Sequence, residues 1–180
     1  MFSDLNRFAI RPTQSLNILY DNRDSLSLIV KDIIDSIPEF DSLIDKEHTS
    51  IPNRSVALFT LSALYRGTDS LLKGLDLSVD EQSYFAISFW KNVYENMVEW
   101  QEVYNKSVKS SVVRKNSLSP LSITIKAIGA TGNELYQSKE LNTFSALEGL
   151  KYVDWQKTNP IWNNGIIVNG SVQLSHATHQ

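Results

Sequence analysis

The clearest pattern along the chain is a narrow polar stripe on an otherwise apolar segment between residues 53 and 73. Its polar positions recur at steps of seven, four, three and four residues and so share one side of a helix: Ser55, Ser62, Arg66, Asp69 and Lys73. Nearly all of the intervening residues are apolar. Because a helix with so wide an apolar surface is buried on several sides, the pattern predicts that residues 54–73 form the central helix of the fold.

Two longer helices flank this segment in the sequence. Asp24 is a good N-cap for an amphipathic helix that Pro38 stops. Ser78 and Glu81 form a capping box before a helix of about 25 residues that carries an aromatic stripe. Such a stripe can stack nucleobases, but at a spacing of about 3.6 residues it belongs more often to a core.

Shorter elements complete the pattern. Thr13 or Ser15 caps a short helix near the start of the chain, and residues 39–53 form a polar, acidic loop. Ser119 and Pro120 indicate the start of another helix, and residues 143–150 form a last one. Residues 166–173 alternate around Asn169-Gly170, which predicts a small C-terminal β-hairpin. The predicted fold is mainly α, with six to eight helices in a single domain over residues 1–180.

Composition narrows the function classes. The 180 residues suffice for one domain with a sizeable core, and the net charge of −3 gives no global attraction to nucleic acid or membrane, so any anion site is a local patch. The absence of cysteine excludes disulfides, thiolate catalysis and cysteine-ligated metal sites. No apolar run reaches the roughly 18 residues of a membrane span, and the first residues carry no signal-peptide core. We expect a cytoplasmic protein with no membrane partner.

Catalytic motifs are absent from the sequence. There is no P-loop, no GxSxG, no HExxH and no GxGxxG after a strand, so no catalytic residue, cofactor or metal is predicted and an enzyme is disfavoured. Asp41 and Asp45 of the acidic loop could chelate Mg²⁺, but no known Ca²⁺- or Mg²⁺-binding motif is present, and a solvated loop is the preferred interpretation. His176 and His179 lack a third ligand.

Residues 105–133 form the one electrostatically distinctive stretch. No Asp or Glu occurs between Val103 and Glu134, and five cations lie there: Lys106, Lys109, Arg114, Lys115 and Lys126. Exposed cations and hydroxyls suit contacts to a phosphate backbone. The alternative is a solvated basic face that pairs with the acidic loop. The sequence leaves both interpretations open.

Five segments carry a family resemblance: Met1 to Asp24, Asn53 to Leu72, Phe89-Trp90 with Glu99-Trp100, Ala127 to Leu135, and Val153 to Trp162. Together, and in this order, they resemble the DndB family, which is associated with DNA phosphorothioation. The opening FSDLN…RPTxSL and the closing DWxxxNPxW are the most specific. The family's DGQHR motif is absent. The chain therefore looks like the C-terminal half of such a protein, with residues 1–23 as the remnant of a junction to a ParB-like N-terminal region.

The resemblance implies a role in a DNA-modification and phage-defence system. Members look like DNA-binding regulators of the modification genes rather than sulfur-transfer enzymes. The family-motif residues carried over are Asp4, Asn6, Pro12, Asp154, Trp155, Asn159, Pro160 and Trp162, together with Arg11 and Ser15. The alternative for Trp155, Pro160 and Trp162 is a packed corner that closes the domain. For Arg11, Arg54 and Arg114 it is pairing at helix ends or on the surface.

The leading hypothesis is therefore a DNA-binding, regulatory component whose partner is double-stranded DNA. Its predicted nucleic-acid contacts are Arg11, Ser15, Arg54, Lys106, Lys109, Arg114 and Lys115. The second hypothesis is a helical interaction module, without DNA contact of its own, that associates with itself or with other components of the modification system. The third is a Mg²⁺-dependent nuclease that uses the acidic loop.

Overall fold

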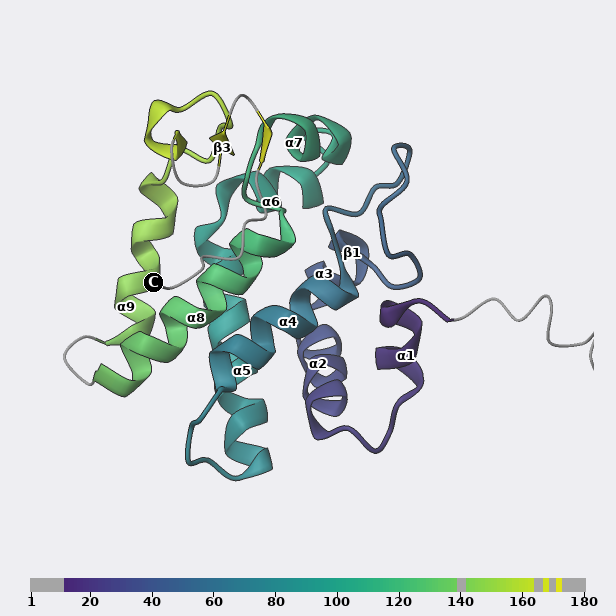
Figure 1. The fold of residues 1–180 in the computed structure, drawn as a ribbon, viewed down its shortest axis with the longest axis vertical. Helices are drawn as coiled ribbons and strands as arrows, with labels where there is room; N and C mark the ends of the chain where they lie inside the picture. Colours follow the sequence, from purple (N-terminus) through teal and green to yellow (C-terminus); the bar gives the residue numbers. More distant parts are fainter. Residues whose placement is uncertain (1–11, 139–141, 164–166, 169–170, 173–180) are drawn as a thin grey trace, which may run out of the picture.

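A computed structural model describes residues 12–138, 142–163, 167–168 and 171–172 (Figure 1). Within these residues the α-helices are α1 (Gln14–Tyr20), α2 (Ser25–Ser36), α3 (Pro38–Leu43), α4 (Leu61–Leu72), α5 (Val79–Asn96), α6 (Val98–Tyr104), α7 (Ser110–Asn116), α8 (Ser122–Ser138) and α9 (Thr143–Leu147). Two 3-10 helices follow, η1 (Glu148–Tyr152) and η2 (Pro160–Trp162). The prediction of a mainly α fold is confirmed.

Strands are confined to two short pairs in the described residues. β1 (Ile44–Asp45) lies parallel to β2 (Phe59–Thr60), with Ile44 opposite Phe59. β3 (Ile167–Val168) lies antiparallel to β4 (Ser171–Val172), which confirms the predicted C-terminal hairpin. The turn residues Asn169 and Gly170 lie outside the described residues. No helix in the described part of the chain is long and apolar enough to cross a bilayer.

The predicted central helix exists as α4, in the middle of the molecule (Figure 1), but it begins at Leu61 rather than at residue 54. The Thr60 hydroxyl accepts a hydrogen bond from the backbone N–H of Ala63 at 3.2 Å, so Thr60 is the N-cap. At the other end Gly74, which follows the C-cap residue Lys73, adopts a positive φ of 71°, the conformation with which glycine commonly ends a helix. Residues 54–58 form an ordered loop instead.

Two glycines of α8 allow it to cross α4 closely. A Cβ added to Gly129 would come 2.0 Å from the Gly67 carbonyl oxygen, and one added to Gly132 would come 2.8 Å from the Leu71 side chain of α4 and 2.3 Å from Phe89 of α5. Beyond the crossing, the Asn133 side-chain amide donates to the carbonyls of Leu71 and Lys73, at 2.8 and 2.9 Å. These bonds satisfy carbonyls that the end of α4 leaves open. The AIGATGNEL segment of the family resemblance thus has a packing role.

The aromatic stripe predicted for residues 78–104 forms the core. Trp90, Trp100 and Phe89 have no exposed surface, and the Trp90 indole N–H donates to the Thr68 hydroxyl at 3.0 Å. Phe40 and Phe59, from elements earlier in the chain, pack against the same cluster.

The prediction of one continuous helix over residues 78–104 was wrong, because α5 ends at Asn96 and α6 begins at Val98. The Gln101 side-chain amide donates to the carbonyls of Tyr94 and Glu95, at 3.0 and 2.9 Å. A side chain from the next helix thereby takes the place of the backbone donors that a continuous helix would supply.

The helix N-caps were predicted more accurately than the lengths of the helices. Thr13 caps α1, Asp24 caps α2, and the predicted box of Ser78 with Glu81 is present at α5. Two boundaries differ. Residues 39–43 of the predicted acidic loop belong to α3, because Phe40 and Leu43 share one face of a turn and are buried. Helix α8 begins at Ser122 rather than after Ser119, whose hydroxyl is bonded elsewhere.

Candidate nucleic-acid interface

The turn that follows α6 holds Lys106 in an unusual backbone conformation. Lys106 has a φ of 61°, the only non-glycine residue with positive φ in the described part of the chain. Its N–H donates to the Val103 carbonyl at 3.0 Å, and that of Ser107 donates to the Glu102 carbonyl at 2.9 Å. This pair of bonds is a Schellman motif, in which glycine usually occupies the position that Lys106 has here. The turn presents the Lys106 ammonium to solvent.

Helix α7 is joined to the loop at residues 52–57 by one side chain. The Arg114 guanidinium donates to the carbonyl oxygens of Pro52, Asn53, Ser55 and Ala57, and also to the Ser110 hydroxyl. Burial lowers the pKa of Arg114, and the charge of Asp45 opposes that shift. Its donors face the protein, so Arg114 holds the loop in place rather than presenting a free cation.

Two adjoining hollows, of about 630 and 680 Å³, lie around this loop and α7. Asn53 and Ser111 line both of them. The other polar lining residues include Arg54, Ser55, Lys106, Lys109, Ser110, Arg114, Lys115 and Asn116. Among the residues that the structure describes, no Asp or Glu lines either hollow. Arg54, Lys106, Lys109 and Lys115 are all exposed, and we call these four residues the basic face.

The basic face does not pair with the acidic segment in the described residues. Asp41 pairs with Lys46 at 2.5 Å. Asp45 accepts from the backbone N–H groups of Glu47 and His48, and the His48 ring lies 3.0 Å from it. Burial opposes the ionisation of Asp45, but these hydrogen bonds and the His48 ring outweigh it, so its pKa is lowered. Both carboxylates are thus engaged within their own segment.

Three predicted nucleic-acid contacts, Ser15, Arg114 and Arg11, are not part of the basic face. Ser15 is fully buried in α1, and its hydroxyl donates to the His48 carbonyl at 3.3 Å, so it offers no surface to a phosphate. Arg114 is engaged as described above. Arg11 lies outside the described residues, as do Asp4 and Asn6 of the family motif. Pro12 is described and is exposed.

Sequence reasoning missed the connection between α7 and the C-terminal motif. The Lys157 ammonium donates to the carbonyls of Arg114 and Lys115 at 3.0 and 2.8 Å, and its backbone N–H donates to the Asn116 carbonyl. A cation at the C-terminal end of a helix satisfies open carbonyls and interacts favourably with the helix dipole. Burial lowers the pKa of Lys157. The position of Lys157 just after the DW pair was the only signal for this role.

The closing motif forms a corner on both sides of Lys157. Asn159 caps η2 through its side-chain oxygen, which accepts from the Ile161 N–H at 3.0 Å, and Pro160 occupies the first turn. The Trp162 indole N–H donates to the Asp154 carbonyl at 2.9 Å. The rings of Trp155 and Trp162 are stacked, with centroids 5.8 Å apart and planes at 12°. These contacts agree with the packed-corner interpretation of the motif.

A carboxylate fastens this corner to α6. The Glu99 side chain accepts hydrogen bonds from the hydroxyls of Ser117 and Ser119, at 2.5 and 2.6 Å, and from the Gln156 amide at 3.0 Å. Ser117 and Gln156 also form a backbone bridge. The structure therefore brings two distant segments of the family resemblance, the one with Glu99 and the one with Trp155, into one network.

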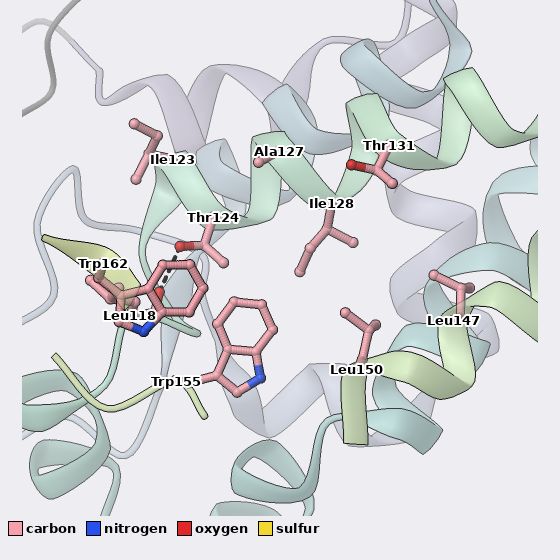
Figure 2. A pocket seen from close by; sticks show the side chains of 10 residues that line it. All are labelled: Leu118, Ile123, Thr124, Ala127, Ile128, Thr131, Leu147, Leu150, Trp155 and Trp162. Atoms are coloured by element: carbon pink, nitrogen blue, oxygen red, sulfur yellow. Dashed lines mark hydrogen bonds between the residues drawn. The ribbon is translucent and has the colours of Figure 1, made fainter. Parts of the chain in front are cut away.

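An apolar pocket of about 420 Å³ opens on the other side of this corner (Figure 2). Its lining residues are Leu118, Ile123, Thr124, Ala127, Ile128, Thr131, Leu147, Leu150, Trp155 and Trp162. Figure 2 shows Ile128 and Thr131 of α8 on one side, with Leu147, Leu150 and Trp155 opposite. The pocket was not predicted, because its walls come from segments that the sequence pattern assigns separately to core or corner.

The described residues thus form an α-helical domain. Its basic face surrounds two hollows that none of the described carboxylates lines, and its apolar pocket lies apart from that face. A family model described as DndB, DNA-sulfur modification-associated, matches residues 1–180. The chain therefore belongs to the DndB family, as its sequence segments indicated, and its role lies in DNA sulfur modification systems. No curated protein and no solved structure matches it.

Proposed function

We propose that this protein is a DNA-binding, regulatory component of a bacterial DNA sulfur modification and phage-defence system, and that it contacts DNA phosphates through its basic face. The observation that carries the proposal is the arrangement of the four exposed cations of that face around hollows without a carboxylate. Membership of a family associated with DNA sulfur modification supplies the context.

The geometry suits backbone contacts better than base readout. Lys106 and Lys109 approach from the turn between α6 and α7, Lys115 from α7, and Arg54 from the loop that Arg114 holds. Neutral donors such as Asn53 and Ser111 lie between the cations. Phosphate oxygens accept bonds from both kinds of donor, and such contacts position a protein on DNA without reading sequence. Sequence selection then comes from another part of the system.

The acidic segment gives the nuclease hypothesis little support. Asp41 and Asp45 are engaged with Lys46, His48 and backbone donors. No group of three metal-ligating side chains gathers anywhere in the described residues. The proposal therefore assigns binding, and no cleavage chemistry, to this chain.

Fluorescence anisotropy with a labelled duplex, at two salt concentrations, tests the proposal. We expect affinity to fall steeply with salt, because each phosphate contact releases condensed counterions. In the double variant Lys109→Glu/Lys115→Glu, affinity should fall by at least about tenfold, and the slope of log K against log salt should shrink by about 2.

A matched double variant distinguishes an effect of the basic face on DNA binding from an effect of the protein's net charge. Lys73→Glu/Lys91→Glu makes the same change in net charge at two exposed lysines that line neither hollow. Its affinity should stay close to that of the parent. If both double variants bind alike, or if the parent does not bind duplex DNA at low salt, the proposal fails.

A further inference from the structure

The apolar pocket beside the Trp corner presents almost only carbon to its interior. Eight of its ten lining side chains are hydrocarbon or indole, and none of the described residues that line it is charged. The Thr124 hydroxyl is already bonded to the Leu118 carbonyl at 2.8 Å. The Trp155 indole N–H is buried without an acceptor in the described structure, so the exposed part of that ring is carbon. Such a lining selects an uncharged, aliphatic or aromatic occupant.

An exposed apolar side chain lies next to this pocket in the chain. Ile161 is 73% exposed, although it directly precedes the pocket residue Trp162. Tyr152, which lies between the pocket residues Leu150 and Trp155, is 86% exposed. The corner holds Ile161 firmly through the Asn159 cap and the Trp162–Asp154 bond. A side chain fixed in this way loses little conformational entropy when it inserts into a partner.

The charges beside the pocket allow the surface to face a copy of itself. The exposed charged residues adjacent in sequence to its lining are Lys126, Lys151, Glu148 and Asp154, two of each sign. Because these charges sum to zero, the surface has no net electrostatic repulsion from its own copy. The basic face, in contrast, would repel itself. A projection and a hollow on one surface are self-complementary under a two-fold axis, because the projection of each copy meets the hollow of the other.

We propose that the pocket receives Ile161 of a second copy of this chain, in a symmetric dimer in which each copy gives one side chain and accepts one. Tyr152 packs at the edge of the contact and keeps its hydroxyl in water. Ile161 fits the occupant that the lining selects, because its side chain has no polar group. None of the four basic-face residues lines this pocket.

Sedimentation velocity over a range of micromolar concentrations tests the dimer. We expect the parent to shift from monomer to dimer as its concentration rises. Ile161→Lys should weaken the dimer by roughly tenfold or more, because it places a charge in an apolar pocket. Ala127→Trp should weaken it similarly, because Ala127 is an exposed α8 residue that lines the pocket and a larger side chain fills the hollow.

Tyr84→Lys is the matched control, since Tyr84 is 77% exposed and lines a different hollow at the start of α5. It should leave the dimer unchanged. Circular dichroism melts should show that all three variants are folded. A parent that stays monomeric at every concentration overturns the proposal, and binding of the small apolar probe indole to that monomer would assign the pocket to a small molecule. A dimer that resists Ile161→Lys or Ala127→Trp overturns it as well.

Discussion

Gly129 lies so close to Gly67 that a Cβ on Gly129 would come within 2.0 Å of the Gly67 carbonyl oxygen. The obstacle is backbone, which cannot turn aside as a flexible side chain can. Gly129→Ala should therefore force α8 away from α4 and lower the free energy of unfolding by about 3 kcal/mol. Chemical denaturation measures this change. Gly149→Ala is the control, because a Cβ there meets nothing within 4 Å. Equal stability of the two variants would contradict the close crossing.

Lys106 lies in a conformation that favours glycine, so its removal should have opposite effects on stability and binding. Lys106→Gly relieves about 1 kcal/mol of backbone strain and should raise the free energy of unfolding by about 0.5 kcal/mol after the added chain entropy is subtracted. Its salt slope for DNA should fall by about 0.9, as expected for one lost phosphate contact.

The control for Lys106→Gly is Lys115→Gly, which removes the same charge from within α7. It should weaken DNA binding to a similar extent but lower stability by about 1 kcal/mol, because glycine is unfavourable within a helix. A loss of stability in both variants would show that the turn after α6 does not strain Lys106.

Arg114 and Lys115 are neighbours in α7 with different expected roles. Arg114→Ala leaves the carbonyls of the 52–57 loop without their donor, and it should lower the free energy of unfolding by about 3 kcal/mol. Lys115→Ala should change stability by less than about 0.5 kcal/mol and should mainly weaken DNA binding. Arg114→Lys should not restore stability, because an ammonium lacks the planar fork of donors. Thermal melts with matched anisotropy titrations separate the two roles.

Asp24 makes the stability of the protein depend on pH in acid. Burial opposes its ionisation, but hydrogen bonds from Ser27, the Tyr65 hydroxyl and two backbone N–H groups outweigh that effect and lower its pKa. Because the folded pKa lies below the unfolded value of about 3.9, the stabilisation is present above about pH 4. It is lost as the pH falls through the folded pKa.

Asp24→Asn keeps a side chain that can cap α2 but weakens its hydrogen bonds by removing the charge. It should therefore lower stability at neutral pH by about 1 kcal/mol and flatten the dependence of stability on pH between about pH 4 and the folded pKa. Tyr65→Phe should give an intermediate result, because it removes the 2.8 Å bond from the tyrosine hydroxyl. Denaturation at a series of pH values measures both, with the exposed Asp76→Asn as a control for the loss of a charge. An unchanged acid profile in Asp24→Asn would refute this assignment.

Elements specified by neighbouring residues were predictable from the sequence. The caps at Thr13, Asp24 and Ser78 depend on side chains that bond N–H groups two or three residues away, so local spacing was sufficient. The break at Met97 depends on Gln101, whose amide replaces backbone donors only when α6 turns. No periodicity carries that information, because the apolar spacing continues through the break.

The candidate site also combines features that the local sequence predicts with features that depend on distant contacts. The excess of positive charge around α7 was visible in the sequence, and Lys106, Lys109 and Lys115 are exposed as a solvated basic surface requires. Arg114 and Ser15 were chosen for their residue type, but the backbone carbonyls that they bond lie more than 30 residues away. Only the fold could show that their polar groups are already bonded.

The bonds from Arg114 to the 52–57 loop also link folding to binding. The loop closes over a distance of about 60 residues in sequence, and loop closure of that length is entropically unfavourable until its contacts form. We therefore expect the loop to become ordered when α7 docks, and α7 and residues 52–57 to exchange their amide hydrogens as one unit. Any local opening that releases α7 then separates Arg54 from Lys109 and Lys115, so the surface proposed to bind DNA exists only while this unit is closed. DNA that bridges these cations should slow that exchange.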